Sequence, residues 1–104
     1  MQIVELLFFY LFKHKSTMDA NFKLIDGEFS VEEAREVITN LLEFKIQYHS
    51  KQSFSSEIRR GLKDEPSLER KENLIVTKQE FLKYLENFAD GDRITIYSEI
   101  QAKK

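Results

Sequence analysis

The chain has 104 residues, a formal net charge of −2 and no cysteine, with 33% charged and 41% hydrophobic residues. This length allows one domain, and the composition is that of a folded, helix-favouring protein. The lack of cysteine excludes disulfides, thiolate metal sites and thiol catalysis. It also favours a reducing compartment, so we expect a cytoplasmic protein. The net charge offers no general basic surplus of the kind that nucleic-acid binding requires.

Residues 1–17 differ in composition from the rest of the chain. Residues 3–12 are almost all apolar, and a short basic and polar run follows at residues 13–17. The apolar run is about half the length that a membrane-spanning helix needs. Its positive charge follows the apolar run, whereas a secretory signal carries it in front. Three interpretations stay open: a core element, an apolar arm that docks on a second copy, or upstream sequence translated before a true start at Met18.

Residues 18–104 are expected to form a single domain that opens with a short strand. Residues 21–25 alternate between polar and apolar side chains, and Asp26-Gly27 then predicts a tight turn in which Gly27 takes a positive φ. Ser30, followed three residues later by Glu33, forms the capping-box pattern of a helix start.

The helix that follows is predicted to be long and amphipathic. Its apolar positions cover an arc of about 160°; they are Val31, Ala34, Val37, Ile38, Leu41, Leu42, Phe44 and Tyr48. Ile46 falls outside this arc. The pattern is lost near residues 50–53, which predicts a kink or a restart capped by Ser53 or Ser55.

A predicted loop at residues 62–67 contains Pro66, the only proline of the chain. A second amphipathic helix is expected between Leu68 and Ala89, and residues 93–100 alternate strictly with β-branched residues, as a strand does. The fold class is therefore α+β: strand, long kinked helix, helix, strand, with an antiparallel helical hairpin packed on a small antiparallel sheet. A sheet of two strands is marginal and has open edges, which predicts a homodimer.

One segment resembles half of a calcium-binding loop. Asp26-Gly27-x-Phe29-x-x-x-Glu33 matches the second half of an EF-hand loop, but the first and third ligand positions would be Phe22 and Leu24. Neither side chain can bind a hard cation. We therefore expect no calcium site, and no other metal or cofactor.

No catalytic constellation is visible. His14 and His49 are the only histidines, and neither stands in a metal-binding or triad pattern. On a helical wheel His49 lies opposite the apolar arc, near Lys45 and Gln52, which predicts a partly exposed surface side chain. No residue is assigned a catalytic role, and a non-enzymatic protein is expected.

Two groups of residues are candidates for contact with a partner. The densest basic cluster, which can contact phosphate or an acidic partner or simply compensate the helix dipole, consists of Lys51, Arg59, Arg60 and Lys63. The residues expected to take part in self-association are Phe8, Phe9, Phe12, Ile94 and Ile96. The leading hypothesis is a non-enzymatic protein-interaction module that self-associates. The alternative is a nucleic-acid-associated accessory protein that uses the basic cluster.

A resemblance adds to this interpretation. The run from Phe22 through Asp26-Gly27-Glu28-Phe29-Ser30, together with Ser53-Phe54-Ser55-Ser56-Glu57, resembles a family of small uncharacterised bacterial proteins of about this size. The resemblance implies a bacterial source and no particular activity.

Overall fold

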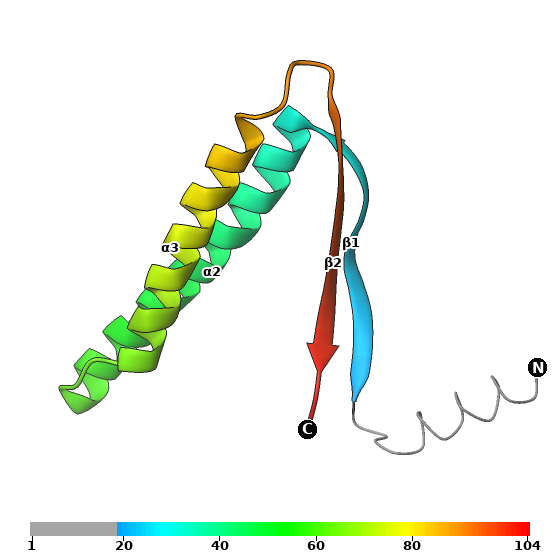
Figure 1. Cartoon of the computed structure of the whole chain (residues 1–104). Coiled ribbons are helices and arrows are strands. Elements are labelled where there is room, and N and C mark those ends of the chain that lie inside the picture. The colour runs from blue at the N-terminus through cyan, green and yellow to red at the C-terminus, as the bar shows by residue number, and fades with distance from the viewer. Residues whose placement is uncertain (1–18) are drawn as a thin grey trace, which may run out of the picture. The chain divides into compact units, whose positions relative to one another are not determined.

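The structure, a computed structural model, describes residues 19–104. The element order is β1 (Ala20–Ser30), α2 (Val31–Arg60), α3 (Glu65–Leu85) and β2 (Arg93–Ala102) (Figure 1). The predicted α+β class and the predicted order are therefore confirmed. Within the described range the chain forms two compact units, one of residues 28–94 and one of residues 19–27 with 95–104. The predictions for residues 1–17 lie outside the described residues.

Helix α2 begins where the capping box predicts. The Ser30 hydroxyl accepts a hydrogen bond from the Glu33 backbone N–H at 3.1 Å, and the Ser30 N–H donates to Glu33 Oε1 at 3.0 Å. The helix ends at Gly61, which takes a left-handed φ of 69° and donates its N–H to the Glu57 carbonyl at 2.9 Å. Only glycine adopts this φ at little cost, which explains its place after the last turn.

The predicted restart near residues 50–53 is wrong, because α2 is one continuous helix of 30 residues. No glycine or proline stands within it, and the serines there do not act as caps. Instead Ser53 and Ser56 are buried, whereas Phe54 and Ile58 are exposed. The hidden side of the helix therefore becomes polar toward its C-terminal end, and the helix itself continues.

Helix α3 begins earlier than predicted. Asp64 is its N-cap and accepts a hydrogen bond from the Ser67 N–H at 3.1 Å. Pro66 stands in the first turn, where its missing N–H would have no intrahelical partner in any case. The loop between the helices is consequently only residues 61–64. After Leu85 the chain turns through Gly91, whose φ of 92° suits glycine.

The two helices form an antiparallel hairpin, in which they lie side by side (Figure 1). Its buried apolar residues are Ala34 and Ile46 from α2 and Leu74 and Leu85 from α3. The side chain of Lys78 is paired with Glu43 across the helices, which fixes their register. Because the helices are antiparallel, position numbers that lie level with one another rise along α2 as they fall along α3. Position 46 therefore lies level with 74 or 75, and position 49 with 71 or 72.

The two strands form a two-stranded antiparallel sheet, as predicted (Figure 1). The predicted turn at Asp26-Gly27 is wrong: β1 runs straight through both residues, and Gly27 has no positive φ. Near the helix junction Arg93 donates to the Glu28 carbonyl at 3.4 Å and lies 3.7 Å from Glu33. The first residue of β2 is thereby tied to the start of α2.

Among the described residues, no helix is long and apolar enough to cross a membrane.

Candidate interaction surface

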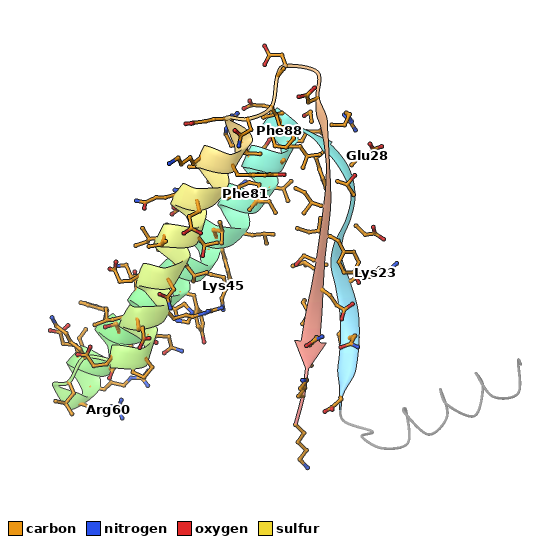
Figure 2. All side chains as sticks on the ribbon, in the orientation of Figure 1. Lys23, Glu28, Lys45, Arg60, Phe81 and Phe88 are labelled. Carbon is orange, nitrogen blue, oxygen red and sulfur yellow. The ribbon has the colours of Figure 1, made fainter. Side chains whose placement is uncertain are left out.

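Part of the predicted basic cluster comes together at the loop end of the hairpin. A shallow pocket of about 310 Å³ is lined there by Gln52, Ser55, Ser56, Arg59, Arg60 and Asp64. Lys51 and Lys63 do not line it. Arg60 lies at the opposite end of the hairpin from Phe88 (Figure 2). The structure therefore brings two of the four predicted residues to one pocket.

The charges in this pocket are partly compensated. Arg60 Nη2 donates to Ser56 Oγ at 3.1 Å, and Ser56 in turn donates to the Leu62 carbonyl at 2.9 Å. Asp64 adds a carboxylate to the lining. The C-terminal end of a helix also carries partial negative charge. The arginines thus compensate the partial negative charge at the end of α2, and Asp64 reduces the positive charge of the pocket.

The remaining predicted contact residues lie elsewhere. Phe8, Phe9 and Phe12 fall outside the described residues. Ile94 is buried within its own chain, and Ile96 is half-buried. Of the two members that the structure describes, only Ile96 is partly exposed.

Helix α2 carries two rows of residues with spacings of four and three, which alternate strictly in the outer row. The inner row consists of Ile38, Leu42, Ile46, His49, Ser53 and Ser56, all buried or half-buried. The outer row consists of Val37, Leu41, Phe44, Tyr48, Lys51, Ser55, Ile58 and, just past the helix end, Leu62. Such spacing places the members of a row along one seam of a helix that packs on another helix. The inner row is the one that α3 covers.

The outer row exposes large apolar side chains. Phe44 is 72% exposed, Ile58 69% and Leu62 67%, and Leu41 and Tyr48 are also exposed. Phe54, which flanks the row, is 65% exposed. Single exposed apolar residues are ordinary on a protein surface, whereas several of them along one side of a helix make that side a candidate interaction surface. Lys51 and Ser55 interrupt this row.

Polar neighbours hold Tyr48 in place at the middle of the row. Gln52 Nε2 donates to Tyr48 Oη at 2.9 Å, and the Lys45 ammonium lies 5.1 Å from the centre of the Tyr48 ring. His49 lies edge-on to the same ring at 5.2 Å. These contacts keep an amphipathic aromatic side chain at the surface, as is common where partners bind.

The prediction for His49 needs correction. Both of its ring nitrogens are buried and have no hydrogen-bond partner, and the residue is half-buried. It belongs to the inner row, because the true buried seam is centred closer to Ile46 than the predicted arc was.

Within residues 19–104 no group of three or more histidine or acidic side chains could hold a metal ion.

The sheet contributes a smaller apolar patch. Phe22 and Leu24 of β1 and Tyr97 of β2 are exposed. Tyr97 Oη donates to Glu99 Oε2 at 2.6 Å, and this hydrogen bond, followed by burial and the negative charges of Glu99 and Asp26, raises the pKa of the Tyr97 hydroxyl. Lys23 pairs with Asp26 at 3.2 Å along the same strand.

The exposure of the outer row was not predicted from the sequence, although the spacing of its residues is visible there. The predicted arc of about 160° combined the first half of the outer row with Ile38 and Leu42 of the inner row, and it left out Ile46 and His49. The alternating spacing of four and three would have separated the two rows.

Comparisons of the chain with protein-family models, with curated proteins and with solved structures find no match.

Proposed function

We propose that this chain is a small non-enzymatic interaction module that self-associates as a homodimer. The observation that carries the proposal is the exposed outer row of α2, with Phe44 and Ile58 among its most exposed members. Removing apolar surface from water is the main favourable term in protein association. A helix bearing a second apolar seam gains this term only when something covers that seam.

The open edges of the two-stranded sheet give a second reason for association. A two-stranded sheet is marginal alone, and its unpaired backbone groups accept further strands. The proposal therefore allows association through helices, through strands, or through both.

Sedimentation velocity of the full chain at micromolar concentration tests this proposal. We expect a concentration-dependent shift from monomer to dimer. A second measurement at high salt separates apolar from charged contributions, because salt screens only the latter. A strict monomer over the whole micromolar range would overturn the proposal.

The second candidate function is association with nucleic acid, for which the observation is the placement of Arg59 and Arg60 at one pocket. Asp64 and the negative end of the helix dipole make it the less favoured candidate. It requires retention on DNA or RNA that weakens with salt and is lost in the double variant Arg59→Ala, Arg60→Ala. No retention at low salt would remove this candidate.

A further inference from the structure

The chain contains two Asp-Gly sequences, and the structure places them in different surroundings. Asp26-Gly27 lies inside β1, whereas Asp90-Gly91 lies in the turn between α3 and β2 (Figure 1). We propose that Asp90-Gly91 is a site of spontaneous backbone rearrangement, at which Asp90 becomes isoaspartate, and that Asp26-Gly27 is protected by its strand. The proposal is independent of self-association.

The reaction needs no enzyme and no reactant other than water. The backbone nitrogen of the glycine attacks the side-chain carboxyl carbon of the aspartate. A carbon–nitrogen bond forms, the amide hydrogen and the carboxyl hydroxyl leave together as water, and a succinimide ring results. Water then opens the ring at either carbonyl, which gives aspartate again or isoaspartate, in which the main chain continues through the side-chain carbons. Glycine favours ring closure because no side chain obstructs its nitrogen.

The turn between α3 and β2 exposes both reacting groups. It is closed by the Asp92 N–H, which donates to the Ala89 carbonyl at 3.1 Å, and by the Ala89 N–H, which donates to Asp92 Oδ2 at 2.8 Å. Asp90 and Gly91 are its two central residues, and both are exposed. Among residues 19–104 the Gly91 N–H donates to no backbone carbonyl, and Asp90 forms no ion pair. The rotation that ring closure requires therefore opens at most the two hydrogen bonds between Ala89 and Asp92.

The strand holds the other Asp-Gly sequence. β1 is extended through Asp26 and Gly27 and is paired with β2, and Gly27 is half-buried. The Asp26 carboxylate also lies 3.2 Å from the Lys23 ammonium. Ring closure turns the aspartate backbone out of the extended conformation, so it requires β1 to separate locally from β2. Rearrangement at Asp26 should therefore be limited by this opening.

Isoaspartate would change the connection into β2. The rearrangement adds one methylene group to the main chain between Ala89 and Asp92 and leaves a carboxylate attached directly to the main chain. The two hydrogen bonds that close the turn depend on the separation of Ala89 and Asp92, so we expect both to weaken. Arg93, the next residue, donates to the Glu28 carbonyl and lies 3.7 Å from Glu33. The modification would therefore act beside the contact between β2 and the start of α2.

Peptide mapping by liquid chromatography and mass spectrometry tests the proposal on the full chain. The protein is aged in mildly acidic buffer, because the carboxyl group loses its hydroxyl most readily when it is protonated. We expect succinimide and isoaspartate to form at Asp90 at least about tenfold faster than at Asp26, because β1 must first open. In concentrated guanidinium chloride, where neither sequence is held by structure, the two positions should react at similar rates.

Two substitutions at the same position identify the reacting group. Asp90→Glu keeps the negative charge, but the larger ring that it would form closes far more slowly, so the products at position 90 should be lost. Asp90→Asn should give the same succinimide faster at neutral pH, because ammonia leaves in place of water. Both side chains stand at an exposed position, so the circular dichroism spectrum should stay unchanged.

Three results would overturn the proposal. An Asp90 that stays unmodified in the folded chain, under conditions in which the denatured chain reacts, would mean that the turn protects it. Equal rates at Asp26 and Asp90 in the folded chain would mean that the strand gives no protection. Undiminished isoaspartate in Asp90→Glu would place the reaction at another residue.

Discussion

Ser30 and Glu33 show how two side chains fix the start of the long helix. Each satisfies a backbone N–H that the first turn of a helix leaves without a partner. The Ser30 backbone N–H is the main cause that lowers the pKa of the Glu33 carboxyl below its ordinary value of 4.5, followed by the Ser30 hydroxyl and, against a small effect of burial, the charge of Arg93. The charged form of Glu33 is therefore the one that the fold favours.

Because folding lowers the pKa of Glu33, the stability of the protein depends on pH. A carboxyl whose pKa is lowered on folding contributes stability above its unfolded pKa, and that contribution is lost as the pH falls through the lowered folded pKa. We expect Glu33→Gln to reduce the urea midpoint at pH 7, and the difference from the native protein to shrink below about pH 4. Glu36→Gln removes a charge from the same helix without removing a capping contact, and it serves as the control. A difference that is equal at pH 7 and pH 3 would contradict the capping role of the Glu33 charge.

At the scale of the element, α2 is a helix with two seams of different composition. Its inner row is apolar in the first half, with Ile38, Leu42 and Ile46, and polar in the second half, with His49, Ser53 and Ser56. Burial of an imidazole without hydrogen-bond partners is costly. The hairpin is therefore held mainly by the part nearer the strands, and its loop end is the less stable end.

Two substitutions only two positions apart on α2 should differ sharply. Ile46 is 8% exposed, so Ile46→Ala should lower the free energy of unfolding by about 2–4 kcal/mol. Phe44 is 72% exposed, so Phe44→Ala should change it by less than about 0.5 kcal/mol when measured below the concentration at which copies associate. Urea unfolding followed by circular dichroism measures both. Equal costs would mean that the two rows have been assigned to the wrong sides of the helix.

Helix α2 and the strand before it show what the sequence can and cannot predict. The caps at Ser30 and Gly61 were predictable, because each depends on a few neighbouring residues with specific chemistry. The side of α2 that faces α3 was not, because apolar residues stand on both seams and only the partner helix decides which seam is covered. Gly27 illustrates a different failure. A glycine after an aspartate is typical of a turn, but strand pairing continued through it.

For the molecule as a whole, the element order and the antiparallel pairings followed from the sequence, since short connections leave few topologies to choose from. The candidate interaction surface did not follow from the sequence, because it depends on which apolar residues the fold leaves uncovered. Only part of the predicted basic cluster came together, since Arg59 and Arg60 line the pocket whereas Lys51 and Lys63 do not.

The position of the two strands at opposite ends of the described chain governs the order of folding. The helical hairpin closes over a loop of a few residues, whereas β1 and β2 are separated along the chain by both helices, so we expect the strands to pair after the hairpin has formed. Until then each strand has both edges free. A strand from another molecule at the same stage competes for those edges, so crowded refolding would favour exchange of β2 between chains. We therefore expect rapid refolding from dilute solution to favour pairing of β1 and β2 within the same chain.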